Sequence, residues 1–138
     1  MIKKSPKPRK HNRRKTQGKI IPNGVSLEKH ENDIVVVFTE LGYDVELIPT
    51  ARQRQVKTAD AIIDGLEWEF KTPRGKTTRS IQHIIKKAVS QSPNVVIDAR
   101  LMDLPDEVIL RKVQYEADHT RSLRRLKLIL GEEVVDIK

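Results

Sequence analysis

The segment ADAIIDGLEWEFKTPRGK, residues 59–76, decides the fold because it predicts a β-hairpin that turns at Asp64-Gly65. Asp-Gly between runs of β-branched and aromatic residues is a strong hairpin signal, since both positions tolerate the positive φ of a type I′ turn. With these two residues as the loop, Asp60 falls directly opposite Glu69. Cross-strand neighbours lie about 5 Å apart, and like charges so placed repel. We therefore expect a cation between the two carboxylates, and a divalent metal is the first candidate.

Strand side chains alternate between two faces, so this register gives the hairpin one apolar and one polar face. The apolar face contains Ala61, Ile63, Leu66, Trp68 and Phe70, and the polar face contains Asp60, Glu67, Glu69 and Lys71. Asp60 and Glu69 match the oxygen ligands of Mg²⁺ sites, with the backbone carbonyl of Phe70 as a third ligand. Lys71 can orient or deprotonate an attacking water, or stabilise charge on a phosphodiester in its transition state. The alternative is a surface salt-bridge cluster, which contributes little to stability.

Composition limits the remaining classes of protein. The 138 residues fit one domain, and the absence of cysteine excludes disulfides and thiolate zinc sites. No apolar run approaches the roughly 18 residues of a membrane span, and no apolar segment of a secretory signal follows the basic N-terminus. We therefore expect a cytoplasmic protein without a membrane partner.

The net charge of +8 is concentrated at the N-terminus. Residues 1–24 hold nine of the 27 Lys and Arg residues and no acid, so residues 25–138 are close to neutral. Low hydrophobicity and charge of one sign predict a disordered basic tail over 1–24 and a folded domain over 25–138. Such a tail either attracts nucleic acid without reading its sequence or only improves solubility.

The spacing of apolar residues predicts the other elements. Helices are expected over residues 26–41, 78–91 and 104–119, and further strands over 43–48, 94–99, 126–130 and 134–137, with a polar loop over 50–58. Ser26 is the expected cap of the first helix and Gly42 its stop, although the β-branched run 34–38 would also suit a strand. A helix between the hairpin and strand 94–99 predicts a crossover and parallel pairing. The fold class is α/β, with a mixed central sheet flanked by helices.

Several side chains outside the hairpin are candidates for the same site. Glu31 lies on the apolar stripe of the first helix, where it either completes the site or reaches water at the edge of the stripe. The basic residues after the hairpin predict a nucleic-acid-binding surface, or alternatively a solvated helix face, and they are Arg74, Lys76, Arg79, Lys86 and Lys87. His83 is either a general acid or an ordinary surface histidine. A glycine-rich phosphate loop, zinc-ligand spacing and a nucleophile elbow are not found in the sequence.

The order of Glu31, Asp60 and Glu69-Phe70-Lys71 resembles the PD-(D/E)xK nuclease superfamily, which has a restriction-endonuclease-like core. Ala59 stands where that motif has its proline. Three segments are more closely similar to the C-terminal toxin domain of contact-dependent growth-inhibition (CdiA-type) proteins of the tRNA nuclease type. These segments are ENDIVVVFTELGYDVE, KTADAIIDGLEWEFKTPRGKTTRSIQHIIKKA and QSPNVVID, and the likeness covers residues 25–137.

The resemblance implies a metal-dependent ribonuclease that uses Mg²⁺ or Mn²⁺, cleaves tRNA and is neutralised by a cognate immunity protein. It implies Asp60 and Glu69 as metal ligands, Lys71 as the catalytic lysine and Glu31 as an auxiliary acid; Thr72 and Gln91 are weaker candidates. Delivery into the cytoplasm of a target cell and an elongation-factor helper are further expectations of this kind, and a stand-alone or mobile-element nuclease is the alternative to delivery between cells. Two alternatives stay open: a DNA endonuclease of the same superfamily, and a non-catalytic RNA- or DNA-binding protein.

Overall fold

A computed structural model describes residues 9–10, 16–49 and 58–138 of the chain, and for residues 9–10 it describes the backbone. The predicted loop over 50–58 lies outside these residues except for Thr58. The strands are β1 (Arg9–Lys10), β2 (Ile20–Ile21), β3 (Val45–Leu47), β4 (Ala61–Ile63), β5 (Leu66–Lys71), β6 (Asn94–Asp98), β7 (Arg125–Leu130) and β8 (Glu133–Asp136). The helices are α1 (Lys29–Glu40), α2 (Arg79–Ala88) and α3 (Asp106–Asp118). None of these helices is long and apolar enough to cross a membrane.

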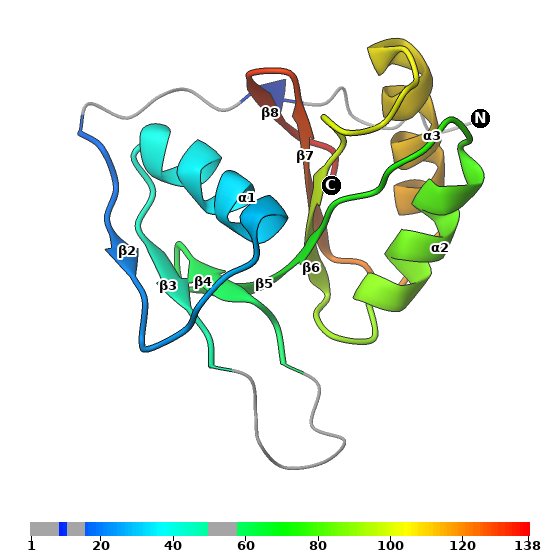
Figure 1. The fold of residues 1–138 in the computed structure, drawn as a ribbon. Coiled ribbons are helices and arrows are strands. Elements are labelled where there is room, and N and C mark those ends of the chain that lie inside the picture. The colour runs from blue at the N-terminus through cyan, green and yellow to red at the C-terminus, as the bar shows by residue number, and fades with distance from the viewer. Residues whose placement is uncertain (1–8, 11–15, 50–57) are drawn as a thin grey trace.

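The strands form one mixed sheet in the order β1-β8-β7-β6-β5-β4-β3-β2. The helices lie on both sides of it, with α1 on one face and α2 and α3 on the other (Figure 1). The core of the α1 side includes Ile34, Phe38 and Trp68, whereas that of the α2 and α3 side includes Ile85 and Val113. The α/β fold class with a mixed sheet and flanking helices is therefore confirmed.

The β4–β5 hairpin has the predicted register. Ile63 pairs with Leu66 and Ala61 with Trp68. The two loop residues have positive φ, 50° at Asp64 and 76° at Gly65, as a type I′ turn requires.

The crossover through α2 is also confirmed, because β6 runs parallel to β5. The strand β7 runs parallel to β6 and continues into the predicted closing hairpin with β8. The strands β5, β6 and β7 therefore run in one direction, and their carboxyl-terminal ends lie at the same end of the sheet. All five residues of β6 are buried, as the apolar run in the sequence indicated.

The first helix begins later than predicted. Its N-cap is Glu28 instead of Ser26, because Glu28 and Glu31 form a capping box in which the Glu31 carboxylate accepts a hydrogen bond from the Glu28 backbone N–H. The predicted stop at Gly42, which has a φ of 95°, is confirmed, and the strand alternative for residues 34–38 is wrong. The second helix ends at Ala88, before the predicted Gln91.

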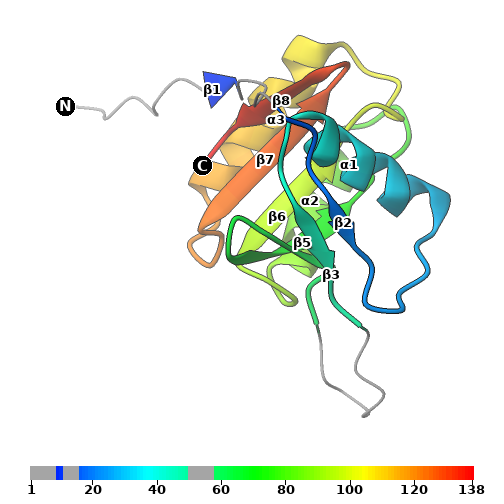
Figure 2. The same cartoon turned by 90° about the vertical axis from the view of Figure 1, so that its left-hand side faces the viewer.

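Residues 16–24, which the sequence assigned to the disordered tail, pack onto the sheet. Strand β2 pairs parallel with β3, and β1 pairs antiparallel with β8 at the opposite edge (Figure 2). The Gly18 N–H donates to the Thr39 carbonyl at 2.8 Å, and a Cβ at Gly18 would come within 1.8 Å of the Tyr43 carbonyl oxygen. Two short strands that precede residue 25 thus pair with the sheet, and such backbone pairing leaves little trace in composition.

Candidate active site

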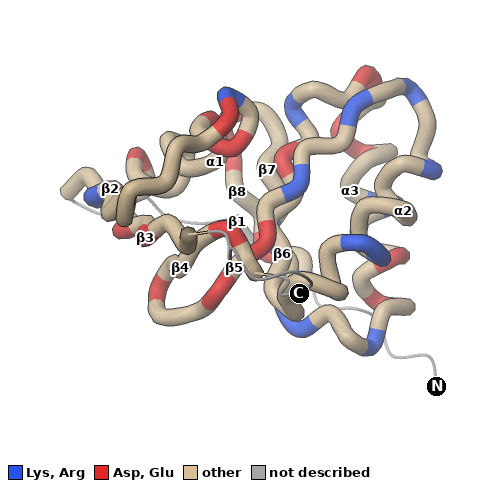
Figure 3. The backbone as a smooth tube through the Cα atoms, turned by 60° about the horizontal axis from the view of Figure 1, so that its bottom comes forward, with Lys and Arg blue, Asp and Glu red and all other residues tan. Residues whose placement is uncertain are grey.

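A cavity of about 460 Å³ lies where the first turn of α1, the β4–β5 hairpin and α2 meet. It is lined by Glu28, His30, Glu31, Asp60, Glu69, Phe70, Lys71, Thr72, Ile84, Lys87 and Gln91. The four predicted catalytic residues, Glu31, Asp60, Glu69 and Lys71, are all among them. Figure 3 shows acidic positions along β5 and basic positions along α2, on the elements that form the walls of this cavity.

Asp60 is held by the backbone of the hairpin. Its N–H donates to the Trp68 carbonyl at 2.9 Å, which extends the β4–β5 pairing by one residue. Its Oδ2 atom accepts a hydrogen bond of 2.7 Å from the Phe70 N–H. The Asp60 carboxylate is therefore fixed against β5 beside Glu69, as the predicted register requires.

Glu69 is the buried acid of the site, with 2% of its surface exposed. Its Oε2 atom lies 3.2 Å from the Lys71 Nζ atom, whereas its Oε1 atom has no hydrogen-bond partner among the described residues. Burial, followed by the neighbouring Asp60 carboxylate, raises the pKa of Glu69 to about 8, and the Lys71 ammonium offsets part of that rise.

Glu31 approaches these residues from α1. It is half-buried, and its Oε1 atom accepts a hydrogen bond of 3.3 Å from the Glu28 N–H. Burial raises the pKa of Glu31, the Glu28 N–H lowers it, and the Asp60 carboxylate raises it further. Glu31 therefore lies beside the hairpin carboxylates, and its part in the chemistry stays a prediction.

The other candidates divide into two groups. Lys87, Gln91 and Thr72 line the cavity, and the buried Thr72 hydroxyl has no hydrogen-bond partner among the described residues. The rest are exposed and lie outside the lining, namely Arg74, Lys76, Arg79, His83 and Lys86. Lys76 forms a long ion pair of 3.9 Å with Asp103.

The side chains of this cavity fit a hard divalent cation. Asp60 and Glu69 supply carboxylate oxygens next to each other, and the burial of Glu69 together with the neighbouring Asp60 disfavours a charge on Glu69. The Glu69 Oε1 atom is an acceptor that no described group satisfies. Carboxylate oxygens in such a position are the ligands that Mg²⁺ and Mn²⁺ prefer.

Sequence reasoning missed two residues of the cavity, Glu28 and His30. Together with Glu31 they bring potential metal-ligand atoms within 4.8 Å of one another. The His30 Nδ1 atom lies 3.5 Å from Glu28 Oε2, and the capping box already accounts for both glutamates. The spacing of Glu28 and Glu31, three residues apart before an apolar run, was the signal that could have found this helix start.

An ion pair at the end of β6 was also missed. Asp98 is buried, and Arg100 donates to both of its carboxylate oxygens, from Nε at 2.9 Å and from Nη2 at 2.8 Å. Arg100 Nη2 also lies 3.3 Å from the Asp33 carbonyl oxygen of α1, to which it donates. An acid at the end of a buried apolar run was its sequence signal, since carboxyl ends of parallel strands often carry functional side chains.

Comparison with known proteins supports the growth-inhibition resemblance. The sequence matches the family described as Contact-dependent growth inhibition CdiA C-terminal domain over residues 57–134. A comparison with curated proteins finds no match. Among solved structures, a chain of the CdiA-CT/CdiI toxin and immunity complex from Burkholderia pseudomallei is similar, with a TM-score of 0.66 and 18% sequence identity over 88% of this chain and 99% of that chain.

At 18% identity the structural likeness shows a shared fold. The family match also shows membership of a family, because it spans over half of the 138 residues and includes the hairpin, α2 and β6. The chain therefore belongs to the CdiA C-terminal domain family, the toxin domains of contact-dependent growth inhibition.

Proposed function

We propose that this toxin domain is a metal-dependent phosphodiesterase of the PD-(D/E)xK type that cleaves RNA, with tRNA as the preferred substrate. The observation that carries the proposal is the buried Glu69 beside Asp60, with an unsatisfied oxygen and with Lys71 at 3.2 Å. A buried acid beside a second, half-buried carboxylate is costly to keep charged without a cation, which argues for function.

Asp60 and Glu69 would hold the cation, which supplies Lewis-acid activation of the phosphodiester and of water. Lys71 Nζ, held in place by Glu69 Oε2, would donate a hydrogen bond to a phosphate oxygen as negative charge develops there. Glu31 would accept a proton or orient the attacking water from the α1 side. Lys87 would bind the neighbouring phosphate of the substrate from α2.

The choice of RNA rests on the three segments that resemble tRNA-nuclease toxin domains. The acids and the lysine themselves do not distinguish ribose from deoxyribose, so a DNA endonuclease is the second candidate. The structural neighbour comes from a toxin and immunity complex, which supports a cognate immunity protein for this chain as well. A target-cell cytoplasm as the place of action and an elongation-factor helper belong to the same proposal.

The test is a cleavage assay with the purified chain on total tRNA, ribosomal RNA and supercoiled plasmid, each with Mg²⁺, with Mn²⁺ and with a chelator. Asp60→Ala and Lys71→Ala should each lower the cleavage rate by about 100-fold or more. Glu67→Ala is the matched control, because Glu67 is an exposed acid on the same strand. If wild type and the two site variants act alike, the assignment of the site is wrong.

The other arms decide between the remaining functions. Plasmid cleavage with intact tRNA favours the DNA endonuclease. Binding that survives the chelator, depends steeply on salt and is lost on deleting residues 1–24, with no product in any arm, favours a non-catalytic binder. Adding an elongation factor to the tRNA arm tests the helper.

A further inference from the structure

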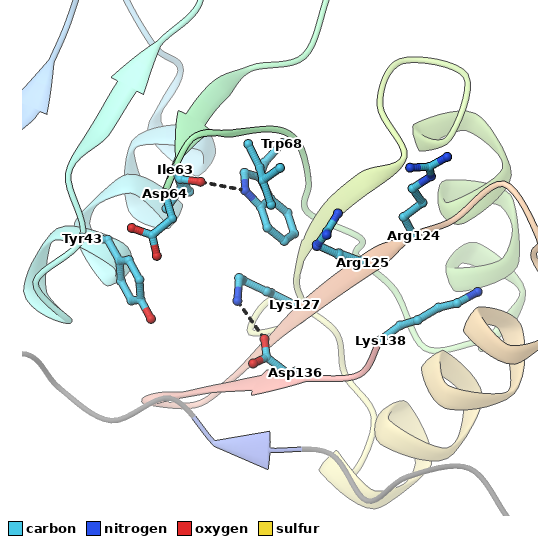
Figure 4. Close-up of a pocket in the computed structure, with 10 residues that line it drawn as sticks. Tyr43, Ile63, Asp64, Trp68, Arg124, Arg125, Lys127, Asp136 and Lys138 are labelled. Carbon is cyan, nitrogen blue, oxygen red and sulfur yellow. Dashed lines mark hydrogen bonds and ion pairs between the residues drawn. The ribbon is translucent and has the colours of Figure 1, made fainter.

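A second, larger cavity of about 530 Å³ lies on the face of the sheet that α1 packs against, and residues of β5, β7 and β8 line it (Figure 4). Its lining consists of Tyr43, Ile63, Asp64, Leu66, Trp68, Arg124, Arg125, Lys127, Asp136 and Lys138. Tyr43, Ile63 and Trp68 are buried, whereas Asp64, Arg124 and Arg125 are exposed at the rim. A volume of this size lies within the usual range for small-ligand sites.

This cavity is distinct from the candidate active site. The two share no lining residue. Trp68 and Glu69 are consecutive on β5, so their side chains project to opposite faces of the sheet. The second cavity also lies at the start of β5, next to the hairpin turn, whereas Lys71 ends the strand.

One wall of the cavity is cationic. Arg125, the first residue of β7, points toward Trp68, while Arg124 just before it lines the rim and extends away from the indole (Figure 4). Among the described residues, no carboxylate forms an ion pair with either guanidinium. Arg125 Nη1 donates to the side-chain oxygen of Asn94 at 3.3 Å, which orients it without neutralising it. Lys127, in contrast, is paired with Asp136 at 2.8 Å.

The opposite wall carries an aromatic ring and a carboxylate. Figure 4 shows Tyr43 and Asp64 across the cavity from the two arginines, with Trp68 between the walls. The Trp68 indole N–H donates to the Ile63 carbonyl at 3.3 Å, and the Lys127 Nζ atom lies 5.3 Å from the centre of the Trp68 ring. The indole is therefore fixed in place.

A nucleotide has two parts that complement these walls: an anionic phosphate for the cationic wall, and a flat base with N–H donors for the opposite one. Arginine binds phosphate oxygens through paired N–H groups, and aromatic and carboxylate side chains recognise unstacked bases. A polyacidic peptide fits less well, because it has no flat base to place against the aromatic side chains of the lining.

We propose that this cavity anchors one nucleotide of an RNA strand outside the active site, with its phosphate on Arg124 and Arg125 and its base against Tyr43 and Asp64. The choice of RNA rests on the proposed function. The basic N-terminal segment supports it, because β1 pairs with β8 so that Arg9 lies opposite Asp136, at the border of the cavity.

The chain offers a direct probe, because Trp68 is its single tryptophan. The full-length, metal-free protein is titrated with a single-stranded RNA pentanucleotide, and Trp68 emission is recorded with correction for nucleotide absorbance. We expect a saturable change in emission. The double variant Arg124→Gln, Arg125→Gln should weaken binding about tenfold or more.

The matched control is the double variant Arg111→Gln, Arg121→Gln, which loses the same charge at exposed positions outside the cavity. It should bind like wild type apart from a small electrostatic loss. Equal losses in the two double variants would overturn the proposal in favour of unspecific charge attraction. Thermal unfolding of each variant verifies that it is folded.

Three other results would also overturn the anchor. They are an emission that RNA leaves unchanged, a response to polyglutamate without one to RNA, and a pentanucleotide without bases (abasic ribose phosphate) that binds as tightly as the RNA pentanucleotide. Because no cleavage is needed, the outcome is separate from that of the proposed function. If the protein binds RNA through Arg124 and Arg125 but cleaves no substrate, the proposed anchor stands and the proposed nuclease function is wrong.

Discussion

At the scale of single residues, Glu69 concentrates the chemistry of this toxin domain. It is buried, it is paired with Lys71 at 3.2 Å, and it faces a second carboxylate on the neighbouring strand. Two measurable consequences follow from this position, one in the absence of a cation and one in its presence.

Without a cation, the stability of the protein should fall as the pH rises. The folded state holds a proton on Glu69 up to a pKa of about 8, while the unfolded chain releases it near 4.5. The folded state therefore binds more protons between these values, and the free energy of unfolding declines from pH about 5 to about 8. Thermal unfolding in chelator should give a higher Tm for Glu69→Gln than for wild type at pH about 8.5, and similar values at pH about 5.

Glu67→Gln is the control for this experiment, because Glu67 is exposed on the same strand. It should follow the wild-type profile at each pH. A wild-type Tm that is flat across this range, or a Glu69→Gln variant that keeps the wild-type slope, would contradict the buried, protonated state of Glu69.

A divalent cation should reverse this loss. Mn²⁺ or Mg²⁺ that binds the folded state alone adds about 2.7 kcal/mol at a concentration of 100 times its Kd. We expect the Tm of wild type at alkaline pH to rise by several degrees on adding the cation, and that of Asp60→Asn to rise far less. Differential scanning fluorimetry across a cation titration measures both, and equal shifts in the two proteins would argue against a site at Asp60.

At the scale of secondary-structure elements, Arg100 joins α1 to the end of β6. It makes paired hydrogen bonds to the buried Asp98, which hold its pKa above the ordinary value, and it also donates to the Asp33 carbonyl. Since α1 carries Glu31, this contact fixes the helix that contributes the third acid to the site.

Replacing Arg100 should therefore destabilise the fold. Arg100→Gln leaves the Asp98 carboxylate buried without its partner, and we expect a loss of about 3 kcal/mol in the free energy of unfolding. Denaturant unfolding at neutral pH measures it, with Arg121→Gln as an exposed control that should change little. A loss below 1 kcal/mol for Arg100→Gln would show that Asp98 reaches water instead.

The elements also show which features can be predicted from sequence. The hairpin register followed from Asp64-Gly65, because a two-residue turn fixes pairing locally. That register brought Asp60 and Glu69 together, and the apolar spacing of the first helix brought Glu31 near them. These local and periodic signals gave the core of the candidate site.

Features that depend on contacts between separate parts of the chain could not be predicted in the same way. Strand β2 has two residues and owes its place to pairing with β3, which no local propensity encodes. The helix start moved from Ser26 because the Glu28 and Glu31 side chains cap each other. The second cavity joins β5 to β7, which are far apart in the sequence and are brought close by the sheet order.

At the scale of the whole molecule, basic charge and acidic chemistry occupy different parts of the chain. Residues 1–15 contain eight Lys and Arg residues and no acid, whereas the candidate active site contains four carboxylates, on Glu28, Glu31, Asp60 and Glu69. Attraction of a polyanion and recognition of a single phosphodiester are thus separable.

Deleting residues 1–15 should weaken RNA binding by a similar factor for every sequence tested and make its salt dependence shallower. Fewer counterions are released when fewer phosphates are neutralised. Kd values of the metal-free protein between about 50 and 200 mM salt give the slope. The full-length chain with those eight residues changed to Gln should match the deletion, and an unchanged slope would show that the tail does not contact RNA.

The alternation of Trp68 and Glu69 along β5 has a consequence for turnover. One continuous strand carries both the second cavity and the active site, so the span between the two is set by backbone bonds and contains no hinge. If one RNA is held at both places, cleavage in the active site divides its contacts between two products. Scission itself would then lower the affinity for the products, and the strand would couple the chemical step to product release.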